Sequence, residues 1–158
     1  MSSSKPGDEP DGAVARYVRS GVHSTREVVS FLRRRGVPSG NATRLVQTYQ
    51  TQGWLDDRAG ARLWAGQWAR QGYASAAISC KLAAKGFDTQ VIDEAINRAA
   101  PPSDDEARAR AVLAQRAGHA SGSPSRARLA RALAARGFDA DVIARLLGEP
   151  STPDDAQR

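Results

Sequence analysis

The segment ISCKLAAKGF, residues 78–87, holds the pattern that decides the fold of this 158-residue chain. Ile78 and Leu82 are four positions apart, which places them on one face of an α-helix. Gly86 is expected to end that helix, because glycine readily takes the left-handed backbone conformation found just after many helices. Phe87 is then expected to fold back under the helix that has just ended.

The same pattern occurs three times along the chain. Gly36, Gly86 and Gly137 are separated by 50 and then 51 residues. Apolar residues occupy matching positions eight and four before each glycine, and six and ten after it: Val28, Ile78 and Leu129; Leu32, Leu82 and Leu133; Ala42, Ile92 and Ile143; Val46, Ile96 and Leu147. A period of this length is typical of stacked supersecondary units, each of which gains by burying its flank against a neighbour.

The composition favours helix throughout, because Ala, Arg, Leu and Gln are frequent and strand signals are absent. We therefore predict an all-α fold of three tandem three-helix repeats, helix-turn-helix-like units stacked into an elongated, curved array. The expected helices span 13–20, 24–35, 40–52, 57–71, 74–85, 89–99, 104–117, 124–136 and 139–147. They form repeat 1 (13–55), repeat 2 (56–101) and repeat 3 (102–148), between disordered tails at 1–12 and 149–158.

Local signals mark the expected helix ends. Two capping boxes are predicted, one at Ser24 with Glu27 and one at Ser103 with Glu106. Ser123-Pro124 predicts a cap followed by proline in the first turn. Aspartates expected to cap helices are Asp56, Asp88 and Asp139, and glycines expected to end them are Gly36, Gly53, Gly72, Gly86, Gly118 and Gly137.

The charge distribution points to an anionic partner. The formal net charge is +6, and without the two predicted tails residues 13–148 hold 21 basic and 11 acidic side chains. Only Lys5, Lys81 and Lys85 of the basic residues are lysines. Arginine binds phosphate and carboxylate through its planar fork, so a polyanion, or a protein assembled on one, is a plausible partner. A solvated basic surface is the alternative reading of the same charges.

Several functional classes are disfavoured. The single Cys80 excludes a disulfide framework and a cysteine-based zinc site, and His23 and His119 are too few for a metal cluster. No nucleophile–base pair or phosphate-binding loop is recognisable. No apolar run approaches the length of a membrane span, and the N-terminal residues lack a signal-peptide core. We expect a cytoplasmic, monomeric, non-enzymatic protein that has no cofactor and no membrane partner.

Three stretches occur in order along the chain. The first is His23-Ser24 with Glu27 and Leu32, and the last is residues 129–138 with Val142-Ile143. The middle one is Gly53-Trp54-Leu55-Asp56-Asp57, followed by Ala61, Trp64, Gly72-Tyr73, Ile78, Leu82, Lys85-Gly86-Phe87 and Ile92. In this order they resemble the first, middle and last repeats of the RecX family of bacterial regulators of the RecA recombinase. The resemblance covers about 13–147. One departure is Gly60, where the family usually has an aromatic residue and where we expect a packing hole.

The resemblance implies a specific role. RecX proteins lie along the groove of the RecA–single-stranded-DNA filament, lower its ATP hydrolysis and strand exchange, and oppose filament growth in recombination, DNA repair and the SOS response. The expected partners are RecA and its nucleoprotein filament, with weak, salt-sensitive binding to single- or double-stranded DNA. A direct nucleic-acid-binding protein of helix-turn-helix type is the alternative, although its recognition helices would carry few basic residues (Arg44 or Arg98).

The candidate contact residues for the filament are all basic. Arg35, Lys85 and Arg136 have equivalent positions at helix ends, where a cation favours the helix dipole without any partner. Arg33 and Arg34 align with alanines, so the repeat pattern does not require them. Trp64 and Trp68 are four apart and are expected in the core rather than as a base-stacking pair. The full set is Arg26, Arg33, Arg34, Arg35, Arg62, Arg70, Lys81, Lys85, Arg126, Arg128, Arg131 and Arg136.

Overall fold

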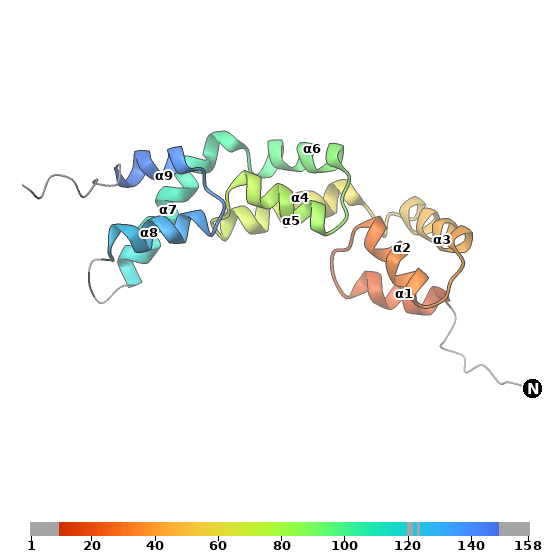
Figure 1. Cartoon of the computed structure of the whole chain (residues 1–158). Helices are drawn as coiled ribbons and strands as arrows, with labels where there is room; N and C mark the ends of the chain where they lie inside the picture. Colours follow the sequence, from red (N-terminus) through yellow and green to blue (C-terminus); the bar gives the residue numbers. More distant parts are fainter. Residues whose placement is uncertain (1–9, 120–121, 123, 149–158) are drawn as a thin grey trace, which may run out of the picture. The chain divides into compact units, whose positions relative to one another are not determined.

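The computed structural model describes residues 10–119, 122 and 124–148, and its regular secondary structure there is entirely helical (Figure 1). The predicted all-α class is therefore confirmed, while the grouping into three repeats stays a prediction. No helix in this part of the chain is long and apolar enough to cross a membrane. The elements are α1 (Pro10–Arg19), α2 (Thr25–Arg34), α3 (Ser39–Thr51), α4 (Asp57–Arg70), α5 (Ser75–Ala84), α6 (Thr89–Ala99), the short 3₁₀ helix η1 (Pro102–Asp104), α7 (Asp105–His119), α8 (Arg126–Ala134) and α9 (Ala140–Leu147).

The observed helix starts confirm some of the predicted caps. At Ser24 the capping box is complete: the Glu27 backbone N–H donates to Ser24 Oγ at 3.1 Å, and the Ser24 N–H donates to Glu27 Oε2 at 2.9 Å. Asp56 accepts a hydrogen bond from the Ala59 N–H at 3.0 Å and so caps α4. Each bond satisfies a backbone donor that the first helical turn leaves without a partner.

Other predicted ends are wrong. The N-terminal helix begins at Pro10, so residues 10–12 are not a disordered tail; residues 1–9 and 149–158 lie outside the described part. The box at Ser103 does not form, because η1 precedes α7 and Glu106 pairs with Arg110 instead. Helix α8 is capped by Ser125 rather than Ser123, and Asp139 makes no side-chain capping bond. Gly118 lies inside α7 rather than after it.

The chain folds into two compact units. The first holds residues 1–64 and 80–95, and the second holds 65–79 and 96–158. Helices α4, α5 and α6 each contribute residues to both units.

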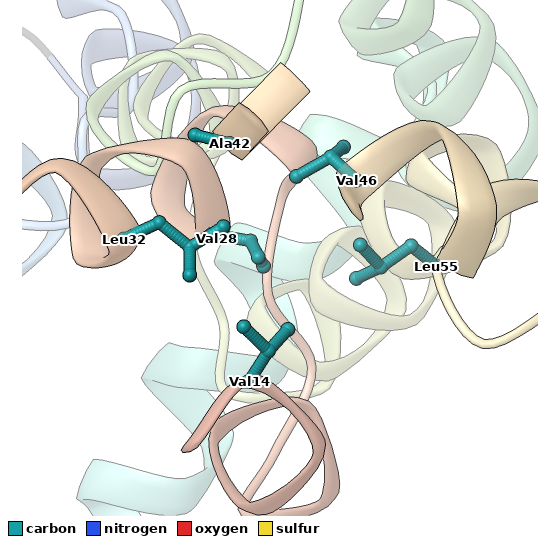
Figure 2. Packing of buried hydrophobic residues seen from close by; sticks show 6 residues of the cluster. All are labelled: Val14, Val28, Leu32, Ala42, Val46 and Leu55. Atoms are coloured by element: carbon teal, nitrogen blue, oxygen red, sulfur yellow. The ribbon is translucent and has the colours of Figure 1, made fainter. Parts of the chain in front are cut away.

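The core of the first unit is formed mainly by α1, α2 and α3. Figure 2 shows its six side chains directed toward one another: Val14, Val28, Leu32, Ala42, Val46 and Leu55. They are buried because α2 packs against α1 and α3. The predicted apolar positions at offsets of four along α2 therefore face this core.

The second unit is built around α7, α8 and α9, which pack against one another. Leu133 and Phe138, the two apolar residues on either side of Gly137, are buried together with Ala74, Ala109 and Val112. As predicted for the glycine turn, the Phe138 N–H donates to Leu133 O at 3.3 Å, which folds the chain back under α8.

An aspartate at the start of one helix holds the first turn of another helix in each unit. In the first unit, the Asp57 carboxylate accepts hydrogen bonds from the Thr25 backbone N–H and from Thr25 Oγ1, both at 2.8 Å. In the second unit, the Asp105 carboxylate accepts the same two bonds from Ser75, at 2.9 Å from the backbone and 2.8 Å from Oγ. A carboxylate bound to a helix N-terminus also stabilises the helix, because its negative charge interacts favourably with the helix dipole.

A glycine turn sits beside each of these contacts. Ser24 Oγ donates to the Lys85 carbonyl in the first unit, and the Ala74 N–H donates to the Arg136 carbonyl at 3.0 Å in the second. We call the two arrangements junctions: junction 1 joins 24–26 to Asp57 and 85–88, and junction 2 joins 74–77 to Asp105 and 136–137. The matching contacts show that the same local packing is built twice.

The glycines are required at the junctions because they take a positive φ in a crowded place. Gly137 has a φ of +83°, and a Cβ there would lie 2.6 Å from Ala77 Cβ. Gly36 has nearly the same φ, +82°, but a Cβ there would meet nothing within 4 Å. The two positions therefore share the same backbone strain but differ in packing.

The expected hole at Gly60 is not present. A Cβ on Gly60 would lie 3.0 Å from Val22 Cγ1 and 3.6 Å from Phe87 Cζ. These two side chains fill the space that an aromatic residue on α4 would need.

Three aromatic rings stack in a column in the first unit. The Tyr17 ring lies 3.9 Å from the His23 ring and 4.2 Å from the Phe31 ring, centroid to centroid. Burial raises the pKa of Tyr17 above its usual 10.0, the charge of Glu27 raises it further, and the charge of Arg34 acts in the opposite direction. The folded protein therefore favours the neutral phenol.

Replacing Gly137 by alanine is expected to destabilise the protein more than replacing Gly36 by alanine. The positive φ costs an alanine about 1–2 kcal/mol at either position. Only Gly137→Ala also forces a Cβ against Ala77, and overpacking of this kind costs a further 1–3 kcal/mol or so. Urea unfolding followed by circular dichroism measures both losses. Equal losses would contradict the close packing of junction 2.

Tyr17→Phe is expected to flatten the loss of stability in alkaline solution. Because the folded protein holds the phenol proton more tightly than the unfolded chain, the stability that this group contributes is present below the unfolded pKa and is lost as pH rises through the folded pKa. Unfolding free energies of wild type and variant, measured by urea titration from neutral to strongly alkaline pH, give the difference. Parallel curves for the two proteins would refute the assigned shift.

Candidate partner-binding surface

The candidate basic residues are divided between the two units. The first unit holds Arg26, Arg33, Arg34, Arg35, Arg62, Lys81 and Lys85, and the second holds Arg70, Arg126, Arg128, Arg131 and Arg136. Their surroundings differ, because some already have partners within the fold and others face solvent.

The end of α2 presents exposed arginines. Arg33 and Arg34 lie in its last turn, and neither side chain makes a hydrogen bond or ion pair with another described residue. Arg35 is the C-cap, and its guanidinium carbon lies 4.9 Å from the centroid of the Phe31 ring. Arg33 and Arg34 can therefore bind a partner without breaking an internal contact.

Lys85 is held within the fold. Its Nζ lies 3.2 Å from Glu27 Oε1 and 4.6 Å from the centroid of the Trp64 ring. Trp64 is fixed in turn, because its Nε1–H donates to the Val22 carbonyl at 3.1 Å. The ammonium thus joins the capping box of α2 to α4, which is a structural role.

Arg26 has a weaker internal partner. Its Nη2 lies 3.5 Å from Asp88 Oδ1, but both side chains are well exposed, at 68% and 76%. Exposed pairs of this kind contribute little to stability. Arg26 can therefore exchange Asp88 for an external anion at small cost.

Three more candidates lie on different helical turns of α4 and α5. Arg62 and Arg70 are exposed on α4, whereas Lys81 is half-buried on α5. The tryptophans of this region do not form an open stacking platform, since Trp64 and Trp68 are both partly buried, in keeping with the predicted core role. Trp54 is the most exposed of the three, at 43%, and the single cysteine, Cys80, is exposed as well.

Helix α8 carries a row of arginines in the second unit. Arg128 and Arg131 are exposed and three residues apart, and their side chains make no hydrogen bond or ion pair with another described residue. Arg136 differs from them, because its guanidinium lies 5.8 Å from the Tyr73 ring centroid and its carbonyl is part of junction 2. Arg128 and Arg131 therefore form the most available basic face of this unit.

Sequence reasoning missed a groove beside this face. It lies between α8 and α9 and has a volume of about 610 Å³. The signal was available in the sequence, because small residues at helical spacing on α8 leave room next to the neighbouring helix. The lining residues are Arg126, Ala127, Ala130, Arg131, Ala134, Ala140, Ile143, Ala144 and Gly148.

Sequence reasoning also missed Arg108. Its Nη2 donates to the Pro101 carbonyl at 3.0 Å, to the Ala100 carbonyl at 3.3 Å, and to the Asp105 carboxylate. It therefore also binds the aspartate of junction 2, at Oδ1, the oxygen that accepts the Ser75 backbone N–H. Within the described part of the chain, no group of three His, Cys, Asp or Glu side chains could hold a metal ion.

Comparison with known proteins agrees with the motifs. No family model matches the chain. The regulatory protein RecX of Thermobifida fusca (strain YX) is 28% identical over 138 residues, which cover 85% of this chain and 74% of that protein. The crystal structure of RecX from Lactobacillus salivarius matches 88% of this chain and 92% of its own length, with a TM-score of 0.67 and 15% identity. A second crystal structure of regulatory protein RecX matches 88% of this chain and 70% of its own length, with a TM-score of 0.68 and 17% identity.

The sequence similarity and the fold similarity extend over the same large share of the chain. The helical fold, the motifs around the three glycines and the curated relative all point to one family, and this chain is similar to the regulatory proteins named RecX.

Proposed function

We propose that this chain binds the RecA–single-stranded-DNA filament, in its groove, and restrains RecA. It would lower ATP hydrolysis, strand exchange and filament growth, and so act in recombination, DNA repair and the SOS response in the cytoplasm. The observation that carries the proposal is the similarity to the regulatory protein RecX over 85% of the chain. The proposal assigns no catalytic step to the chain and no cofactor, and it takes the binding species to be a monomer.

The distribution of positive charge supports a partner that is itself anionic. Arg33, Arg34, Arg128 and Arg131 are exposed and have no ion pair among the described residues. A RecA filament offers both carboxylates and DNA phosphates, and arginine binds either of them through paired N–H donors. We therefore rank these four residues first as contacts, with Arg26, Arg62 and Arg70 next.

The other candidates are ranked lower because the fold already uses them. Lys85 is paired with Glu27, Arg35 lies over Phe31, and Arg136 lies over Tyr73. Lys81 and Arg126 are half-buried. Replacing Lys85, Arg35 or Arg136 would therefore change contacts within the fold as well as any contact with a partner.

Direct reading of duplex DNA is the less favoured function. The helices that would enter a major groove, α3 and α6, each carry a single arginine, Arg44 and Arg98. Specific readout usually requires several side chains that reach base edges from one helix, together with phosphate contacts beside it.

Purified full-length protein is expected to lower the ATPase activity of RecA from the same cell on single-stranded DNA, at substoichiometric to near-stoichiometric amounts. Arg128→Glu combined with Arg131→Glu should weaken that inhibition while the helical content by circular dichroism is unchanged. Arg33→Glu combined with Arg34→Glu should do the same. Raising the salt concentration should weaken wild-type inhibition, because released counterions contribute to binding.

The matched control is Arg44→Glu combined with Arg98→Glu, which changes the net charge equally at two other exposed positions. Its inhibition should stay close to wild type. If the wild-type protein leaves RecA activity unaltered, the proposed function is wrong. If the control loses inhibition as strongly as the Arg128 and Arg131 variant, net charge rather than these residues is responsible.

A further inference from the structure

The groove between α8 and α9 has an apolar floor and a basic margin. Ala127, Ala130 and Ala134 of α8 face Ile143 and Ala144 of α9 across it, and Arg126 and Arg131 lie at its edge. Small side chains on a helix leave space for another backbone to approach closely, and apolar side chains favour burial by a protein partner.

An equivalent groove in the first unit contains another segment of the chain. It lies between α2 and α3, and five of its lining residues have the same offsets from Gly36 as five residues of the α8–α9 groove have from Gly137. Gly86 and Asp88 of junction 1 form part of its wall, and the remaining volume is about 350 Å³. The five pairs are Thr25 and Arg126; Arg26 and Ala127; Val29 and Ala130; Thr43 and Ala144; Gln47 and Gly148.

In both junctions, the helix that corresponds to α8 binds two groups near its start. The helix start receives a carboxylate, from Asp57 at Thr25 and from Asp105 at Ser75. A turn with a glycine then packs on the same helix, at Gly86 and at Gly137. Among residues 10–119, 122 and 124–148, neither a carboxylate nor a glycine turn is bound in this way at the start of α8.

Arg126 occupies the position that Thr25 and Ser75 hold in the junctions. Its Nε is buried and has no hydrogen-bond partner among the described atoms. A buried donor without a partner is costly, and a cationic donor gains most from a carboxylate. Arg126 therefore brings a cationic side chain, whose Nε has no partner among the described atoms, to the position where both junctions bind an acidic group.

We propose that the α8–α9 groove binds a segment of a partner protein that begins a helix with acidic residues and carries apolar side chains and a small-residue turn. The acidic group would pair with Arg126, and the apolar side chains would cover the alanines and Ile143. The inference goes beyond the proposed function, because it does not depend on RecA being that partner.

The chemistry of the groove disfavours the other occupants. A second copy would bring the Gly36 turn, which follows Arg33, Arg34 and Arg35 and would repel Arg126 and Arg131. Residues 149–158 of the chain contain acids, but Pro150 and Pro153 interrupt helix and Ala156 is their only other apolar residue. Nucleic acid would pair with the arginines but gains little from an apolar floor.

The test uses the full chain and a fluorescein-labelled helical peptide that begins Asp-Asp-Glu, continues with Ala and Leu at helical spacing and contains one Gly. A matched peptide begins Asn-Asn-Gln. Fluorescence anisotropy should show that the acidic peptide binds at least about tenfold more tightly than its amide counterpart, as expected for the loss of one charge-assisted contact. Chemical-shift changes in an isotope-labelled protein should map to α8 and α9.

Matched variants locate the site. Arg126→Gln should weaken binding of the acidic peptide about tenfold, whereas Arg116→Gln, at an exposed position of α7 outside the groove, should not. Ala134→Phe should block binding, whereas Ala135→Phe, one residue further along and outside the groove, should leave it intact. Circular dichroism checks that each variant is folded.

Four results would overturn the proposal. The first is absent binding, or equal binding of the acidic and amide peptides. The second is self-association in sedimentation that Ala134→Phe abolishes, which would identify a second copy as the occupant. The third is binding of the acidic peptide only by a chain that ends at Gly148, which would identify residues 149–158 as the occupant of the groove in the full chain. The fourth is a single-stranded oligonucleotide that binds the groove in place of the acidic peptide.

Discussion

The fold depends on a carboxylate bound to the first turn of a helix that lies far from it in sequence. Asp57 binds Thr25 and Asp105 binds Ser75, each through one backbone N–H and one side-chain hydroxyl. Helices of ten residues, such as α2 and α5, have short apolar stripes and are marginal alone, so their ends need partners. The two junctions supply these partners and place the glycine turns at the same time.

The junctions also determine which basic residues remain available. Cations near them, such as Lys85 and Arg136, interact with aromatic rings and helix caps. By contrast, the exposed side chains near the end of α2 and on α8 have no ion pair among the described residues: Arg33, Arg34, Arg128 and Arg131. The proposed binding to a nucleoprotein filament would need this separation, because a contact residue that also stabilises the fold cannot exchange partners freely. Arg126 belongs to neither group, because its Nε has no hydrogen-bond partner among the described atoms and its side chain lines the groove between α8 and α9.

Much of this fold could be predicted from the sequence, because its signals are local. The apolar offsets around Gly36 and Gly86 identified buried residues at all four positions, whereas around Gly137 only Leu133 is buried. Ser24 with Glu27 identified a real capping box. The errors arose where tertiary contacts override local preference: η1 displaced the box at Ser103, and Val22 and Phe87 filled the space at Gly60. The pairing of Asp57 with Thr25 and the groove between α8 and α9 depend on helices that meet only in the folded chain, so residue spacing alone did not reveal them.

The most direct test of this account is a double-mutant cycle across junction 1. Thr25→Ala, Asp57→Ala and the double variant are compared with wild type by urea unfolding. We predict a coupling free energy of about 1 kcal/mol or more, since the bond between Thr25 Oγ1 and Asp57 involves a charged acceptor. Losses that simply add, to within about 0.3 kcal/mol, would show that the aspartate does not hold the helix and would contradict the account.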